Sequence, residues 1–169
     1  MKKIIVLVFA FYSFYSCDHV SNDEEYEKIN WKERIATRKA SDSLEVGKSY
    51  LSVYSQIYSY SQHKTYNLTA MVSMRNTSAT DSLYLFKVDY YDTHGELLKT
   101  YFDQPVFVRP METLDIVINE VDIAGGTGGN FIFDWKTPIG ASEPVFEGVM
   151  TSTSGQQGLS FVTQAKRLD

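Results

Sequence analysis

The chain has 169 residues, of which 43% are apolar, 14% aromatic and 22% charged, and this composition fits one folded domain with additional segments. The net charge is −5, so we expect no basic surface for nucleic acid or anionic lipid headgroups. A single cysteine excludes an internal disulfide and a cluster of cysteine and histidine ligands with zinc-site spacing.

Residues 1–16 have the order of a secretory signal peptide. Lys2 and Lys3 give a positive start, and an apolar run follows that continues through aromatic residues to Ser16. As a helix, residues 4–16 would rise only about 20 Å, short of the roughly 30 Å hydrocarbon core of a bilayer. We therefore expect a cleaved signal. Because it takes two lysines and no acid with it, the mature chain would carry a charge of −7.

Phe14-Tyr15-Ser16-Cys17 resembles a bacterial lipobox, in which the cysteine thiol receives a diacylglycerol before cleavage. The resemblance implies that Cys17 is lipidated and holds the protein on the outer membrane of the cell envelope, at its periplasmic face or at the cell surface. The alternative is an unmodified thiol. Each buried CH₂ contributes roughly 0.8 kcal/mol, so two or three acyl chains would hold the chain on a bilayer almost permanently.

Residues 17–46 have the composition of a charged tether. Five acids and no base lie between Asp18 and Glu27. The run 21–25 resembles the acidic export signal of Bacteroidetes surface lipoproteins; the alternative is a solvated, self-repelling spacer. Ser21 and Glu24 have the spacing of a capping box, which predicts a short helix over about 22–39. Its apolar residues form no broad stripe, so we expect a weakly packed stalk.

The body, residues 47–169, shows alternating strand patterns broken by turn residues. The expected strands cover 50–58, 66–75, 84–90, 97–102, 114–119, 131–136, 145–151 and 159–164. This pattern predicts an all-β fold, an immunoglobulin-like antiparallel β-sandwich of about eight strands. A closed eight-stranded barrel is the alternative. Nothing in the pattern resembles the βαβ units of a Rossmann fold.

Alternation also assigns strand faces. Phe131, Phe133 and Trp135 share one face, which points Asp134 the other way. A second expected face carries Tyr84, Phe86, Val88 and Tyr90, opposite Lys87 and Asp89. A third carries Tyr50, Tyr54, Tyr58 and Tyr60 in a row. Exposed, such a row could stack on glycan or anchor a protein interface; core filling is the alternative.

Several stretches of the body resemble an uncharacterised bacterial family, catalogued as domain of unknown function three-one-two-four. The similar stretches lie in family order at 53–58, 66–70, 75–77, 88–92, 122–131 and 157–161. The resemblance implies a small secreted or lipidated β domain. It brings no established activity, cofactor or site residue with it.

The candidate sites outside the tyrosine row are few. Glu120 and Asp122 flank the glycine loop 125–129, where oxygen ligands could hold Ca²⁺, although such glycines also permit tight turns. Asp89 and Asp92 could form a pair for glycoside chemistry, but solvated strand-end acids are the plainer interpretation. His19, His63 and His94 stand near no recognisable nucleophile motif, so we expect no catalytic triad.

Ser43 and Ser82 each follow an aspartate and precede a leucine, a tripeptide that resembles the O-glycosylation sequon of Bacteroidetes. Both serines lie next to expected loops or linkers, where a sugar could be accommodated.

The sequence therefore favours an envelope lipoprotein that is not an enzyme and needs no cofactor. Its β-sandwich would bind an envelope protein or glycan, or support an envelope assembly, with a membrane contact through lipid and none to nucleic acid. A small hydrolase that uses loop carboxylates, with or without Ca²⁺, is the alternative.

Overall fold

The computed structural model describes residues 29–36, 43–102, 104–153 and 158–168. The predicted signal peptide, Cys17, His19 and the acidic run 18–27 lie outside these residues. The described elements are the 3-10 helix η2 (Trp31–Arg34) and the strands β1 (Leu44–Val53), β2 (Gln56–Ser59), β3 (Ser61–Asn67), β4 (Thr69–Arg75), β5 (Leu83–Tyr91), β6 (Leu97–Thr100), β7 (Val106–Val108), β8 (Thr113–Ile118), β9 (Gly129–Pro138), β10 (Val145–Ser152), β11 (Leu159–Gln164) and β12 (Lys166–Arg167).

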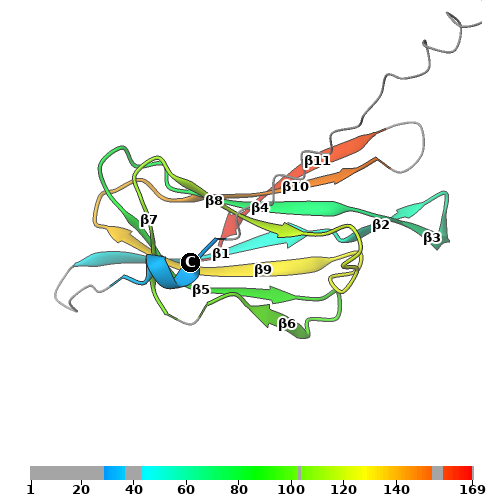
Figure 1. Ribbon diagram of the computed structural model, residues 1–169, viewed down its shortest axis with the longest axis horizontal. Coiled ribbons are helices and arrows are strands. Elements are labelled where there is room, and N and C mark those ends of the chain that lie inside the picture. The colour runs from blue at the N-terminus through cyan, green and yellow to red at the C-terminus, as the bar shows by residue number, and fades with distance from the viewer. Residues whose placement is uncertain (1–28, 37–42, 103, 154–157, 169) are drawn as a thin grey trace, which may run out of the picture.

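Two antiparallel sheets pack face to face, which confirms the predicted β-sandwich (Figure 1). The larger sheet has the order β12-β1-β9-β5-β6, and β7 also pairs with β5; the smaller sheet has the order β11-β10-β4-β8. Only Ala165 separates β11 from β12, so the chain crosses from one sheet to the other along one side. Along the other side, β6 and β8 each pair with a single strand in the described part of the chain, which distinguishes the fold from a closed barrel.

The core follows from the alternation in β9. Phe131, Phe133 and Trp135 are at most 1% exposed, as their shared face predicts. The Phe133 ring stacks on Phe146 of β10 with 4.2 Å between ring centroids, and this contact joins the two sheets. Within the larger sheet, the Tyr90 ring of β5 stacks on Phe131 of β9 with 4.6 Å between ring centroids. Aromatic contacts of this kind stabilise a core beyond their buried area.

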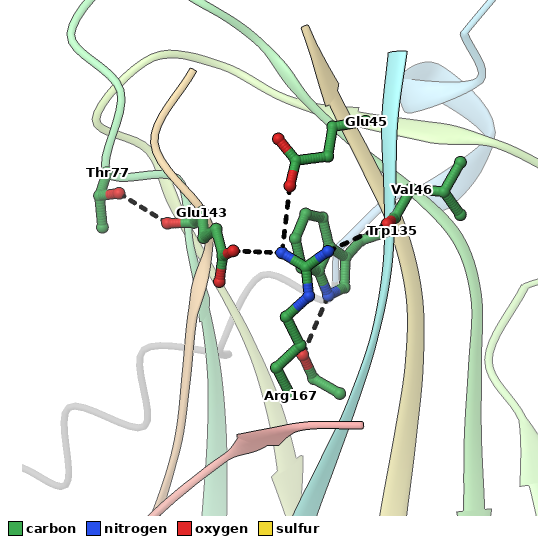
Figure 2. A network of polar contacts seen from close by, with 7 residues as sticks. Glu45, Val46, Thr77, Trp135, Glu143 and Arg167 are labelled. Atoms are coloured by element: carbon green, nitrogen blue, oxygen red, sulfur yellow. Dashed lines mark hydrogen bonds and ion pairs between the residues drawn. The ribbon is translucent and has the colours of Figure 1, made fainter. Parts of the chain in front are cut away.

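Trp135 is held at one end of the sandwich by its neighbours (Figure 2). Its indole Nε1 donates a hydrogen bond of 2.9 Å to Ser49 Oγ. The guanidinium carbon of Arg167 lies 5.1 Å from the ring centroid, and Arg167 also pairs with Glu45 and Glu143. Arg167 therefore fastens the last strand to the first and covers the indole.

Strand β5 contains a bulge that the alternation did not predict. Leu85 pairs with Trp135 and Lys87 with Asp134, so Phe86 is an extra residue on its strand. The prediction that Tyr84 and Phe86 share a face with Val88 and Tyr90 is therefore wrong, because the bulge exchanges the two faces. Leu83 and Leu85 are buried in their place.

The segment before the sandwich packs more closely than predicted. Within residues 29–36 the only helix is the single turn η2, and Ile35 is extended and bridges to Val106 of β7. The Trp31 ring lies 4.9 Å from that of Phe102, and Arg34 makes two hydrogen bonds to the Glu112 carboxylate, of 2.8 and 3.1 Å. The expected α-helix over 22–39 therefore does not extend through this stretch, and the stretch is not a loosely packed stalk.

Strand β1 begins at Leu44, so the larger sheet includes residues 44–46 of the predicted tether. In the residue ranges given above, no helix combines the length and hydrophobicity that crossing a membrane requires.

Candidate functional site

The glycine loop lies at the root of the β2-β3 hairpin. The Gly126 carbonyl accepts hydrogen bonds from the backbone N–H groups of Ser55 (3.1 Å) and Gln56 (3.0 Å), two and three residues after the end of β1. Gly126 itself has a φ of +64°, which favours glycine. A Cβ at Gly125 would lie 1.8 Å from the Tyr90 hydroxyl oxygen. These contacts support the tight-turn interpretation. They also hold the segment between β1 and β2 where the chain leaves the larger sheet; we call this contact the loop clamp at Gly126.

The acidic residues beside this loop make local contacts. The Asp122 carboxylate accepts a hydrogen bond of 3.2 Å from the backbone N–H of Ala124. Across the described ranges, no group of three or more Asp, Glu, His or Cys side chains is placed to hold a metal ion. Among these described residues, Glu120 and Asp122 therefore belong to no such group.

Asp89 and Asp92 belong to two separate networks. Burial acts to raise the pKa of Asp89, but hydrogen bonds from Lys87, Thr100 and Tyr91 outweigh it and lower that pKa. The carboxylate of Asp92 instead accepts backbone N–H bonds of 2.8 Å from Glu96 and His94 in the β5-β6 turn, and these lower its pKa. Each carboxylate thus has its own set of donors, which fits the interpretation of Asp89 and Asp92 as separate strand-end acids.

The other predicted positions are dispersed. His63 is exposed in β3, and His94 is exposed in the β5-β6 turn, where Gly95 has a positive φ of +85°. Ser43 is exposed just before β1, and Ser82 is partly exposed just before β5. Both serines thus lie directly before a strand, and their O-glycosylation stays a prediction.

The four tyrosines expected in one row occupy four different settings. Tyr50 lies in β1, Tyr54 between β1 and β2, Tyr58 in β2 and Tyr60 in the hairpin turn. The prediction of a single strand face is wrong because the loop clamp at Gly126 ends β1 after Val53. Tyr50 donates a hydrogen bond of 2.6 Å to Asn130 Oδ1, and the Tyr54 ring packs on Phe161 at 5.8 Å between centroids.

Tyr58 and Tyr60 are instead displayed on the hairpin, which extends beyond one end of the two main sheets (Figure 1). Their exposed fractions are 62% and 91%. Tyr60 holds a positive φ of 61°, which is uncommon for a residue with a side chain. Its ring meets Tyr66 of β3 edge to face, with 6.3 Å between centroids and 80° between planes.

Lys64 completes this aromatic tip. Its Nζ atom lies 5.3 Å from the Tyr60 ring centroid and 5.6 Å from that of Tyr66, within the range of cation–π attraction. A hydrogen bond with Tyr66 raises the pKa of Tyr60, whereas hydrogen bonds with Ser59 and Tyr60 lower the pKa of Tyr66. We call Tyr58, Tyr60, Lys64 and Tyr66 the hairpin tip.

The hairpin differs in charge from the rest of the chain. No Asp or Glu occurs between Glu45 and Asp81, although the whole chain has a net charge of −5. Within the hairpin, residues 56–67, Lys64 is the only lysine or arginine, and the other residues are mainly Tyr, Ser, Gln, Thr and Asn. The tip is therefore a locally basic, aromatic surface on an acidic protein.

Sequence reasoning found these tyrosines but not the hairpin. The turn at Ser59-Tyr60-Ser61 contains none of the Asn-Gly, Asp-Gly or Gly-Gly pairs that mark two-residue hairpins. A usable signal was the long absence of acids combined with the row of tyrosines.

Three comparisons place the chain among known proteins. The family described as Protein of unknown function (DUF3124) matches residues 46–168. No curated protein matches. Among solved structures, the chain is similar to "Crystal Structure of Thermotoga maritima 1070", with 9% identity, a TM-score of 0.46, and coverage of 71% of this chain and 92% of that one.

Proposed function

We propose a function from the surface of the molecule, since the chain belongs to the family Protein of unknown function (DUF3124). In this proposal it is a non-catalytic binding protein of the bacterial cell envelope that contacts its partner through the hairpin tip. The observation that carries the proposal is the exposure of Tyr58 (62%) and Tyr60 (91%) on a hairpin outside both main sheets.

Exposed tyrosines on a projecting hairpin are better suited to binding a partner than to stabilising the fold. A tyrosine presents a large, rigid, amphipathic surface at low entropic cost, and its hydroxyl still finds hydrogen bonds. Binding surfaces of antibodies are rich in Tyr, Ser and Asn for the same reason. The hairpin has this composition, and the edge-to-face contact with Tyr66 orders the Tyr60 ring before any partner arrives.

We infer that the partner is an envelope protein whose surface is neutral or acidic and has a pocket for a tyrosine ring. The tip projects outward, and it carries Lys64 without any acid in residues 46–80. An envelope glycan stacked on the tyrosines would be the other occupant that such rings accept.

The placement of the hairpin agrees with anchorage through Cys17. Helix η2 lies within the predicted tether, residues 17–46, and at the end of the sandwich opposite to β2-β3 (Figure 1). An outer-membrane lipid anchor upstream of η2 would then leave the hairpin on the far side of the domain. Labelled fatty acid should enter the wild-type protein and not Cys17→Ala; equal labelling of both would refute the anchor.

Photo-crosslinking in cells tests the binding surface. A benzoylphenylalanine placed at position 60 should yield a discrete crosslinked product that contains a second protein. The matched control is the same probe at Val121, which is 87% exposed but lies outside the hairpin. A product of equal yield from position 121, or none from position 60, would contradict the proposal.

A further inference from the structure

The outer face of the smaller sheet carries an apolar row that crosses all four strands. In the register of the sheet, Val117 of β8 pairs with Met71 of β4, Met71 with Val149 of β10, and Val149 with Val162 of β11. Val117 and Val162 are 43% and 56% exposed, and the two central side chains are partly exposed. We call these four residues the belt.

The rows on either side of the belt differ in chemistry. On one side, the same strands present the hydroxyl groups of Thr69, Thr151 and Ser160. On the other side they present Asp115, Ser73, Glu147 and Gln164. The Asp115 carboxylate accepts a hydrogen bond from Ser73 at 2.5 Å, and Glu147 pairs with Arg75 at 3.1 Å. The face is thus apolar in the middle, rich in donors on one side and rich in acceptors on the other.

We propose that this face binds a second copy of the chain in a twofold dimer whose axis runs along the belt. A rotation about that axis places each belt residue against the same residue of the second copy. It also brings the acceptor row of one copy over the hydroxyl row of the other, because the two rows exchange sides. Glu147 then faces Thr151 of the second copy, and Gln164 faces its Ser160. The face is therefore complementary to itself.

The positions of the acidic residues favour a twofold axis along the belt over a twofold axis along the strands. A twofold axis along the strands would lay acceptor row on acceptor row, which gathers Asp115 and Glu147 of both copies in one line. Like charges placed together across an interface oppose association. The axis along the belt separates the two pairs of acids by the width of the belt.

The size of the face predicts a weak dimer. Four strands about 4.8 Å apart and three rows of same-face residues about 6.7 Å apart cover about 400 Å² per copy, or about 800 Å² in total. This is below the usual size of stable interfaces and is typical of weak, transient ones, so we expect association in the range of tens to hundreds of micromolar.

Sedimentation equilibrium of a chain that starts at Asp18 tests the dimer, since this chain retains every described residue and contains no cysteine. The wild-type chain should show a concentration-dependent dimer, and Val162→Glu should weaken its association at least tenfold. Ile139→Glu is the control, because Ile139 is 71% exposed but lies in the turn after β9. Wild-type chain that stays monomeric up to several hundred micromolar, or equal effects of both variants, would overturn the proposal.

Two further variants test the axis. With Val162→Cys as the sole cysteine, a short bismaleimide should link two copies through that residue. Thr151→Arg should strengthen association several-fold, because the new guanidinium would face Glu147 of the second copy. If crosslinking instead requires Val117→Cys on one copy and Val162→Cys on the other, or if Thr151→Arg has no effect, the proposed axis is wrong.

Discussion

Replacing Gly47 by alanine should destabilise the sandwich only while Trp135 is present. The two residues face each other across β1 and β9, and a Cβ at position 47 would lie 2.1 Å from the indole ring. The ring is only 1% exposed and is held by Ser49 and Arg167, so it has no room to retreat. Overpacking of this kind costs about 1–3 kcal/mol.

Trp135→Ala alone should cost about 3–5 kcal/mol, as expected for a buried aromatic side chain. Once the indole is gone, alanine at position 47 meets no ring. The backbone at Gly47 is outside the positive-φ region, so alanine can adopt it. Gly47→Ala should then be neutral, or stabilising by up to about 1 kcal/mol, in the Trp135→Ala background.

Urea unfolding followed by circular dichroism measures the four members of this cycle. We expect a coupling free energy of about 1–3 kcal/mol between positions 47 and 135. Asp134→Ala is the matched control on the opposite face of β9; its partner Lys48 lies 3.2 Å away at the surface, so the cost should stay below about 1 kcal/mol. Additive costs at 47 and 135 would refute the proposed contact between strand and ring.

Three further outcomes are expected. The ionised form of Asp89, whose pKa is lowered, should contribute stability that is present at neutral pH and is lost as pH falls below about 4, so the acid unfolding profile of Asp89→Asn should be flatter than that of the wild type. Trp31→Ala should release the segment that packs on Phe102, seen as several-fold faster tryptic cleavage at Arg34 with the cooperative unfolding of the sandwich retained. Chelation of Ca²⁺ should leave the melting temperature unchanged, and a drop of several degrees would make Glu120 and Asp122 ligands after all.

The fold class could be predicted because alternation is a local property of each strand. Phe131, Phe133 and Trp135 are buried as their spacing predicts, and so are Leu114, Ile116 and Ile118. Alternation failed where a nonlocal contact changes the local pattern. The bulge at Phe86 depends on pairing with β9, and the end of β1 depends on the carbonyl of Gly126, some seventy residues further along the chain.

The candidate site was predictable in its residue type and not in its geometry. The sequence identified tyrosines suited to binding but placed Tyr60 on a strand face with Tyr50. Which of them is exposed depends on where the chain leaves the larger sheet. The anchoring of residues 29–36 was missed for a similar reason, because Arg34 and Glu112 are far apart in the sequence and meet only in the folded structure.

The central claim, that the hairpin tip is the binding surface, is tested most directly by the affinity of the purified chain for the protein that crosslinks at position 60. Tyr60→Ala should weaken this affinity about 30-fold or more, since a hot-spot side chain contributes about 2 kcal/mol or more to binding. Val121→Ala should leave the affinity unchanged, and both variants should unfold at the wild-type temperature. An affinity that Tyr60→Ala leaves unchanged would contradict the claim.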